Sequence, residues 1–262
     1  MKANDWEAPK GTKTFLHAKS ISKSYGGLKA VSEVDLKIHR GEVVALVGDN
    51  GAGKSTLIKM LSGVISPDRG AIEIDGQPIR FLGPSDARTA GIETLHQHLG
   101  LVEVFNVPEN IFLGQELTRR RLGIFKGLDH AKMRRLTEEL LRRVDLRLPS
   151  LDQPVKAMSG GQRQAVAITR MLLNEVHLLI MDEPMAALGV DEGRKVLDLI
   201  VTLRERELST LIISHNLEHV FAIADRIAVM KNGELISVVN TRETTSDEVV
   251  GMIVSGRSYK EA

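Results

Sequence analysis

The sequence contains no cysteine. Its absence excludes a disulfide framework, a zinc ribbon and a thiol nucleophile, and it suits a reducing compartment. No stretch approaches the roughly 18 to 20 consecutive apolar residues that span a bilayer. Residues 1–12 are polar and lack the apolar core of a signal peptide, so we expect a tail on a protein that stays in the cytoplasm. Work at a membrane would require another chain to cross it.

A strong excess of one charge is also missing. The formal net charge is +1, which gives no overall attraction to nucleic acid or to an anionic membrane. Hydrophobic residues make up 42% and charged residues 26% of the 262 residues, as in ordinary globular proteins. This length suits one large α/β domain or two small ones.

Short apolar runs that end at polar residues or glycine are typical of strands buried on both faces of a parallel sheet. Three such runs lie at 43–47, 178–181 and 211–213. Helical patterns accompany them, at 54–62, 161–173, 192–207 and 217–224. Alternation of strand and helix predicts an α/β core.

Other segments predict two additions to this core. Alternating runs at 15–22 and 31–38, separated by two glycines, predict an antiparallel β subdomain, and 71–74 with 78–81 predict a hairpin. From about 100 to 158 no strand pattern is present, and stretches such as 131–144 predict an inserted helical subdomain. We therefore expect one domain at 13–255, with a second tail at 256–262.

A glycine-rich motif follows the first apolar run. The stretch GDNGAGKST matches G-x4-G-K-[ST] between a predicted strand and a predicted helix. Glycines let backbone N–H groups and the helix N-terminus face phosphate oxygens, the lysine reaches the β and γ phosphates, and the serine hydroxyl suits Mg²⁺. A glycine-rich turn with an accidental lysine would lack this context. The expected nucleoside triphosphate ligands are Gly48, Asp49, Asn50, Gly51, Ala52, Gly53, Lys54, Ser55 and Thr56.

Two carboxylates, Asp182 and Glu183, end the apolar run at 178–181. Ligands of open α/β sheets gather at the carboxyl ends of strands, and we expect this strand to be a neighbour of the one before Lys54. Asp182 would then hold Mg²⁺ through water, and Glu183 would orient and polarise the attacking water. The alternative is that both are solvated acids at a strand end without a function. The phosphate loop in the same chain favours the functional interpretation.

The stretch MSGGQRQ at 158–164 completes a set of ordered motifs, with the phosphate loop, "DEP" after the strand at 178–181, and His215 after "TLIIS". With these motifs the chain resembles the ATPase subunits of ABC transporters, from about residue 15 to residue 251. "VPENIFLG" and "DEPMAALGV" are most similar to bacterial monosaccharide importers of the single-cassette fructose or xylose type. The resemblance implies an α/β phosphate-loop NTPase core with an antiparallel β subdomain and an inserted helical subdomain.

The resemblance also implies a head-to-tail dimer. ATP on the phosphate loop of one subunit would be covered by Ser159, Gly160, Gly161 and Gln162 of the other. These residues precede a predicted helix, so hydroxyl and N–H groups are available for a γ-phosphate. A simple helix cap by Ser159 is compatible with that use.

Three further residues match positions of the family. Gln97 matches a glutamine that senses Mg²⁺ and water and connects to the membrane subunit; His96 and His98 beside it could suggest a metal pair, but no carboxylate or cysteine cluster lies nearby. His215 matches a histidine that contacts the γ-phosphate, although a lone histidine at a strand end is more often structural. Tyr25 matches the aromatic residue that stacks on adenine, with a packed surface tyrosine as the alternative.

The chain departs from the family at Gly189, where many members carry an aspartate that links the two ATP sites. Met185 replaces the usual threonine and Met158 the usual leucine, which are apolar changes of tolerable size. We expect hydrolysis to survive, with communication between sites resting on backbone contacts or on Asp191.

Arginines concentrate in the predicted helical insert. Solvated helix faces explain them best, with permease or anionic-lipid contact as the alternative, because nucleic-acid binding favours interleaved aromatic residues. The arginines are Arg119, Arg120, Arg121, Arg134, Arg135, Arg142 and Arg143.

The expected function is that of an ATP-hydrolysing, energy-coupling subunit of an ABC importer, with ATP and Mg²⁺ as cofactors. Its partners would be a second copy of the chain, polytopic permease subunits and, indirectly, an extracytoplasmic sugar-binding protein, with no nucleic acid. It would lie peripherally on the cytoplasmic face of the inner membrane. The alternative is a soluble ABC ATPase of iron–sulfur assembly.

Overall fold

The computed structural model describes residues 12–121 and 125–258. The chain divides into two compact units. The first comprises Met1–Thr94, Val176–Glu183 and Arg204–Ala262, and the second comprises Leu95–Glu175 and Pro184–Leu203. The helical subdomain expected at about 100–158 falls inside the second unit. This unit begins earlier, at Leu95, and also includes the later segment Pro184–Leu203. Most of the tail expected at 1–12 lies outside the described residues, as does the end of the tail expected at 256–262.

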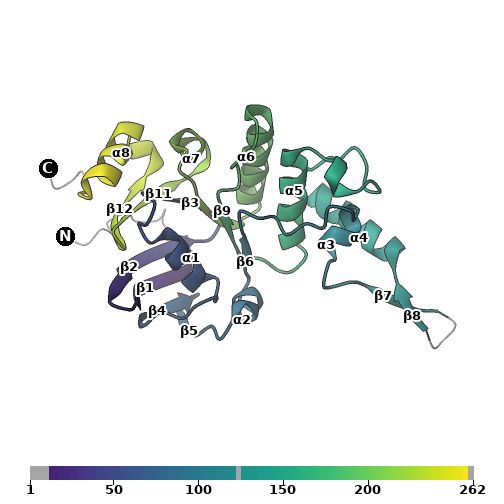
Figure 1. Cartoon of the computed structure of the whole chain (residues 1–262), viewed down its shortest axis with the longest axis horizontal. Helices are drawn as coiled ribbons and strands as arrows, with labels where there is room; N and C mark the ends of the chain where they lie inside the picture. Colours follow the sequence, from purple (N-terminus) through teal and green to yellow (C-terminus); the bar gives the residue numbers. More distant parts are fainter. Residues whose placement is uncertain (1–11, 122–124, 259–262) are drawn as a thin grey trace. The chain divides into compact units, whose positions relative to one another are not determined.

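A six-stranded sheet forms the centre of the first unit, in the order β12-β11-β3-β10-β9-β6. Figure 1 labels β12, β11, β3, β9 and β6 of this sheet. Strand β3 is buried along its whole length and pairs in parallel with β10 and β11. The expectation that β3 and β9 are neighbours was wrong, because β10 lies between them. The strands are β3 (Val43–Val47), β6 (Ile92–Leu95), β9 (Leu178–Asp182), β10 (Ser209–Ile213), β11 (Arg226–Lys231) and β12 (Glu234–Asn240).

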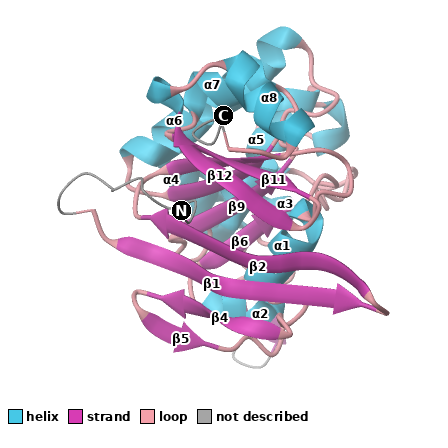
Figure 2. Cartoon of the chain, turned by 90° about the vertical axis from the view of Figure 1, so that its left-hand side faces the viewer, coloured by secondary structure: helices cyan, strands magenta, loops and turns pink. Residues whose placement is uncertain are grey.

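The expected antiparallel β subdomain is confirmed as a four-stranded sheet in the order β2-β1-β4-β5 (Figure 2). Gly26 and Gly27 form the turn between the two long strands with φ of 53° and 92°, a region that glycine adopts most readily. One apolar core, with Leu16, Leu36 and Ile180 among its members, joins this sheet to the central one. The strands are β1 (Thr14–Tyr25), β2 (Leu28–His39), β4 (Arg69–Ile74) and β5 (Gln77–Ile79).

Helices flank the sheets of the first unit and dominate the second. The α-helices are α1 (Lys54–Leu61), α2 (Pro84–Thr89), α3 (Val107–Ile111), α4 (His130–Arg143), α5 (Gly160–Met171), α6 (Val190–Glu205), α7 (Leu217–Ile223) and α8 (Ser246–Ser255). Two short 3₁₀ helices occupy Val155–Ala157 and Thr241–Glu243. Within the described ranges, no helix is long and apolar enough to span a membrane.

The second unit has its own apolar core, which includes Val107, Phe112, Met133 and Val166. The expectation of a strand-free insert was wrong, because β7 (Thr118–Arg121) and β8 (Phe125–Leu128) pair as an antiparallel hairpin. Each strand has four residues and lacks the apolar alternation by which a strand is predicted. The hairpin therefore depends on hydrogen bonds between the two backbones.

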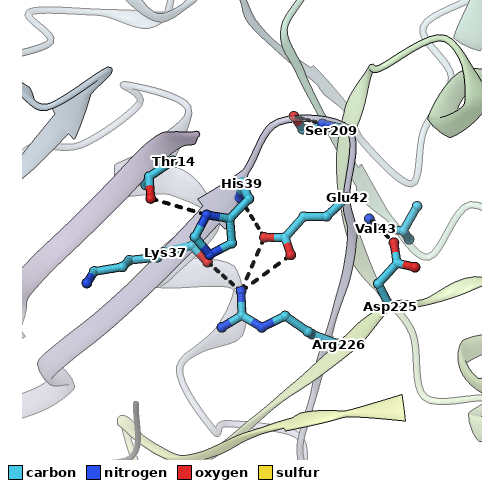
Figure 3. A network of polar contacts seen from close by, with 9 residues as sticks. Thr14, Lys37, His39, Glu42, Val43, Ser209, Asp225 and Arg226 are labelled. Carbon is cyan, nitrogen blue, oxygen red and sulfur yellow. Dashed lines mark hydrogen bonds and ion pairs between the residues drawn. The ribbon is translucent and has the colours of Figure 1, made fainter. Parts of the chain in front are cut away.

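A buried polar network connects β2 and β11 of the first unit with the turn before β3 (Figure 3). Arg226 of β11 donates to the Lys37 carbonyl oxygen at 3.1 Å and to Glu42 Oε1 at 3.2 Å, and the same oxygen accepts from His39 N–H at 2.6 Å. Burial raises the pKa of Glu42 to about 7, although the guanidinium opposes the shift. Burial, followed by the charges of Arg226 and Lys37, lowers the pKa of His39 to about 4.

Candidate nucleotide site

The phosphate loop leaves β3 and enters α1 through two glycines that have no room for a side chain. Gly48 has φ 149°, and a Cβ atom there would stand 2.2 Å from the Met230 carbonyl oxygen. Gly53 has φ 100°, and its Cβ atom would stand 2.5 Å from the Ala30 carbonyl oxygen. Both glycines are therefore required by space as well as by conformation. No side chain caps the start of α1, which suits a helix end that receives an anion.

Lys54 lies at the centre of this loop. Its Nζ donates to the carbonyl oxygens of Gly48 at 2.6 Å and Asp49 at 2.9 Å. Burial lowers the pKa of Lys54, while the negative charges of Glu183, Asp49 and Asp182 oppose that shift. The ammonium therefore lies within the field of both carboxylates at the end of β9. Positive charge and backbone N–H groups beside acidic oxygens can accept a phosphate with its metal ion.

Glu183 adopts an unusual backbone conformation directly after β9. Its φ is 51°, and its N–H donates to the Ile213 carbonyl oxygen of the neighbouring β10 at 3.0 Å. The Glu183 carboxylate is 2.8 Å from Nδ1 of His215, which follows β10. The side chain of His215 is 79% exposed and that of Glu183 21%, so the histidine can leave this contact to reach a ligand. The structure thus brings these two predicted residues together.

Three residues outside the sequence prediction hold the phosphate loop in shape. The Gly233 N–H, in the β11–β12 turn, donates to the Ala52 carbonyl oxygen at 3.0 Å, and its carbonyl oxygen accepts from Ser32 N–H at 2.8 Å. Lys231 Nζ lies 3.5 Å from Asp49 Oδ2. The Asn232-Gly233 turn signal was present in the sequence, but its contact with a loop so distant along the chain was not predictable.

The remaining predicted residues belong to other segments of the chain. Tyr25 ends β1 with a side chain that is 48% exposed, and Lys23 Nζ stands 6.0 Å from its ring centre. Gln97 is exposed and belongs to the second unit, as does the segment that begins at Ser159. Stacking on adenine by Tyr25 and metal sensing by Gln97 stay predictions.

Ser159 is the N-cap of α5, so the capping role considered for it is confirmed. Its hydroxyl accepts from Gln162 N–H at 3.4 Å, and Gln162 Oε1 accepts from Ser159 N–H at 3.0 Å, which together form a capping box. A Cβ atom on Gly161 would stand 3.0 Å from Cβ of Glu192, so α6 packs closely on the start of α5. Contact of this helix end with a second subunit stays a prediction.

Glu192 in the first turn of α6 was not predicted as a site residue. Its pKa is lowered by a hydrogen bond from the Ser159 hydroxyl first, and then by backbone hydrogen bonds from Gly189, Gly161 and Gly160. The sequence did carry a signal, because a glutamate in the first turn of a helix commonly accepts from the N–H that precedes the helix. Gly189 itself has open space within 4 Å around a Cβ atom, so an aspartate would fit there.

These features define a nucleoside triphosphatase of the phosphate-loop class, with a lysine in the loop and carboxylates at the end of a nearby strand. A family model described as "ABC transporter" matches residues 31–186. The chain belongs to this family, and it is an ATP-hydrolysing member.

Curated relatives match nearly the whole chain. The fructose import ATP-binding protein of Rhizobium meliloti is 41% identical over 93% of this chain and 95% of its own length. The xylose/arabinose import ATP-binding protein of Sulfolobus acidocaldarius is 43% identical over 92% of this chain and 94% of its own length. A ribose import ATP-binding protein of Rubrobacter xylanophilus is 40% identical over 97% of this chain, which spans 48% of that relative.

Solved structures agree with the fold. An ATP-binding cassette of an ABC transporter, 26% identical, superposes with a TM-score of 0.80 over 92% of this chain and 97% of its own. A dimeric bacterial ABC transporter cassette, 25% identical, gives a TM-score of 0.70 over 87% of this chain and 99% of its own. The α/β phosphate-loop NTPase fold expected from the sequence is confirmed. The iron–sulfur alternative finds no support, since the three curated relatives named above are import proteins.

Proposed function

We propose that the chain is the ATP-hydrolysing, energy-coupling subunit of a monosaccharide importer. The observation that carries this proposal is that the chain is more than 40% identical to the fructose and xylose/arabinose import ATP-binding proteins. The identity extends over more than 90% of this chain and of each relative. The phosphate loop and the Glu183–His215 pair supply the chemistry that such a subunit needs.

ATP binding falls to residues 48–56. Their N–H groups surround the β and γ phosphates, and Lys54 exchanges its two carbonyl contacts for phosphate oxygens. Tyr25, exposed at the end of β1, stacks on adenine. Ser55 and Asp182 would hold Mg²⁺ through their oxygen atoms, because Mg²⁺ prefers hard oxygen ligands and keeps several waters, and Gln97 would add a further oxygen. When bound, Mg²⁺ neutralises charge on the phosphates.

Hydrolysis depends mainly on position and charge. Glu183 orients and polarises the attacking water, since its carboxylate projects beyond the strand end near Lys54. His215 holds Glu183 through Nδ1 in the free subunit and turns toward the γ-phosphate when ATP is present. One well-placed carboxylate is sufficient for the general-base part of this reaction.

Two copies of the chain close on ATP in a head-to-tail dimer, with Ser159, Gly160, Gly161 and Gln162 of one copy covering the ATP of the other. Closure moves polytopic permease subunits, and hydrolysis resets them. A sugar-binding protein outside the membrane delivers the cargo, and the chain itself lies on the cytoplasmic face. The dimeric cassette among the solved structures supports this arrangement.

The test is a tagged pull-down from native membranes solubilised in detergent, with the bound chains identified by mass spectrometry. We expect polytopic membrane subunits, and an ATPase activity of the complex that rises with a sugar-loaded binding protein. A catalytically dead tagged chain, Lys54→Ala, provides the control for activity. Recovery of soluble scaffold proteins without a membrane subunit would refute transport.

A further inference from the structure

One carboxylate in the second unit serves the N-termini of two helices. Glu192 belongs to α6, and hydrogen bonding from the Ser159 hydroxyl, followed by the N–H groups of Gly189, Gly161 and Gly160, lowers the pKa of its carboxyl. A Cβ atom placed on Gly160 would stand 3.1 Å from Oε2 of Glu192, so the carboxylate lies directly against the start of α5. The start of α5 therefore has an anionic group of its own chain beside it.

The donors at this end cannot serve two anions at once. The Ser159 hydroxyl has a single proton, and each glycine offers a single N–H. The proposed function assigns the same donors to the terminal phosphate of ATP carried by a second subunit. A phosphate that approaches Ser159 and Gly161 has to take the place that Glu192 holds in this structure.

We propose that Glu192 is a built-in substitute for the terminal phosphate of ATP. In the separate subunit its carboxylate satisfies the start of α5, and it is displaced when the partner's ATP docks. This inference rests on the proposed dimeric function and adds its regulation. The γ-phosphate has more charge and more acceptor oxygens than a carboxylate, so it wins the exchange, and Glu192 sets how much ATP closure requires.

Removal of the charge alone gives the sharpest test. Glu192→Gln keeps the shape of the side chain but weakens its bonds to the N–H groups, because hydrogen bonds to ionised acceptors are about twice as strong as neutral ones. It is introduced into a Glu183→Gln chain, in which slow hydrolysis leaves the ATP-bound dimer intact during the measurement. The dimer fraction is then measured by analytical ultracentrifugation over a series of MgATP concentrations.

We expect the double variant to dimerise at lower MgATP than Glu183→Gln alone. An anion at a helix N-terminus changes an equilibrium by roughly threefold to fivefold, and two sites per symmetric dimer make this about tenfold to twenty-five-fold. Glu205→Gln, exposed at the other end of the same helix, removes the same charge and should leave the midpoint unchanged.

Two results distinguish a failure of the proposed role of Glu192 from a failure of the proposed dimeric function. An unchanged or higher MgATP midpoint for Glu192→Gln, with Glu183→Gln itself dimerising, overturns the substitute role alone. Failure of Glu183→Gln to dimerise although it binds ATP overturns the dimer and the inference together.

A second measurement tests whether Glu192 has only a structural role. In an otherwise unaltered chain, Glu192→Gln should lower the KM for ATP and leave kcat unchanged. A fall in kcat at constant KM would mean that Glu192 positions the segment instead of blocking it, and would also overturn the proposal. Thermal unfolding of both variants checks that the fold is retained.

Discussion

Glu183 is held in a backbone conformation that costs a non-glycine residue about 1–3 kcal/mol. The hydrogen bond of its N–H to Ile213 of β10 fixes this conformation, and the side chain consequently turns toward His215. A carboxylate that simply continued the line of β9 would follow the alternation of the strand. The strain therefore sets the direction in which the proposed base projects.

At this residue we expect Glu183→Gln to lower the rate of ATP hydrolysis by about 10²- to 10⁴-fold, the usual contribution of a general base. ATP affinity should be preserved and the ATP-bound dimer favoured, because the amide keeps the shape. Phosphate release and nucleotide binding are measured in parallel, with the exposed Glu234→Gln as the matched control. Full activity in Glu183→Gln would remove this residue from its role.

Glu42 makes stability depend on pH. Its pKa is about 7 in the folded chain against an ordinary 4.5, so the folded state binds the extra proton between these values. The contribution of Glu42 to the free energy of unfolding is therefore largest below pH 4.5 and falls as pH rises to 7. His39, with its pKa lowered from 6.5 to about 4, acts in the opposite direction between pH 4 and 6.5.

A single substitution isolates the effect of Glu42. The free energy of unfolding of Glu42→Gln, relative to the unaltered chain, should increase between pH 4.5 and 7 by about 3 kcal/mol, at roughly 1.36 kcal/mol per pKa unit. Urea unfolding at several pH values measures this difference. A flat difference for Glu42→Gln would show that this carboxyl titrates normally.

Among the elements, α6 begins directly after a glycine. The first hydrogen bond of this helix runs from the Gly193 N–H to the Gly189 carbonyl oxygen at 2.8 Å. Gly189 has no side chain that could cap the N–H groups of Glu192 or Gly193. Aspartate is a better N-cap than glycine by a few tenths of a kcal/mol, and space for it exists. Packing therefore does not explain the missing charge.

We expect Gly189→Asp to stabilise the chain slightly and to change the rate or the cooperativity of ATP hydrolysis. The physical reason is that the new carboxylate can cap the first turn of α6 and adds negative charge beside the carboxylate of Glu192. Initial rates over a range of ATP concentrations measure both quantities. Rates and Hill coefficients equal to those of the unaltered chain would show that communication between sites does not involve this position.

The loop before α3 is organised by one buried amide. Asn110 donates to the carbonyl oxygens of Val102, Phe105 and Asn106 at 3.1, 3.2 and 3.1 Å, and accepts from Val102 N–H at 2.7 Å. We expect Asn110→Ala to destabilise the chain by about 1–3 kcal/mol for each group left unpaired. Thermal unfolding measures the loss, and the exposed Asn174→Ala should not reproduce it.

Elements with a strong local pattern could be predicted from the sequence. The apolar run of β3, the Gly26-Gly27 turn and the phosphate loop each follow from their own residues. The β7–β8 hairpin was missed because its short, charged strands depend on pairing and not on apolar alternation. The wrong neighbour for β9 has a similar cause, since a buried apolar strand does not specify its partner.

The same limit applied to the site. The loop ligands, Glu183 and His215 follow ordered motifs, whereas Glu192 and Gly233 act through residues far away in the sequence. Side-chain type at a given position predicts chemistry, but it does not predict which distant backbone will stand beside it.

At the scale of the whole molecule, the two units are interleaved along the chain. The first is assembled from three segments, and its central strand β3 pairs with β10 and β11, which come from the last of them. Pairing over such separations carries a large loop-closure entropy, so we expect slow folding compared with a chain whose neighbours in sequence are neighbours in space.

This arrangement has a consequence for the order of events during synthesis. Lys54 and its glycines leave the ribosome early, yet Met230 and Gly233, which press against the loop, are made near the end. A nascent chain that stops at Glu175 has the phosphate motif but neither strand beside it, and it should bind no ATP. Nucleotide can therefore stabilise this protein only once translation has passed Gly233, which makes ATP a late folding ligand and not an early one.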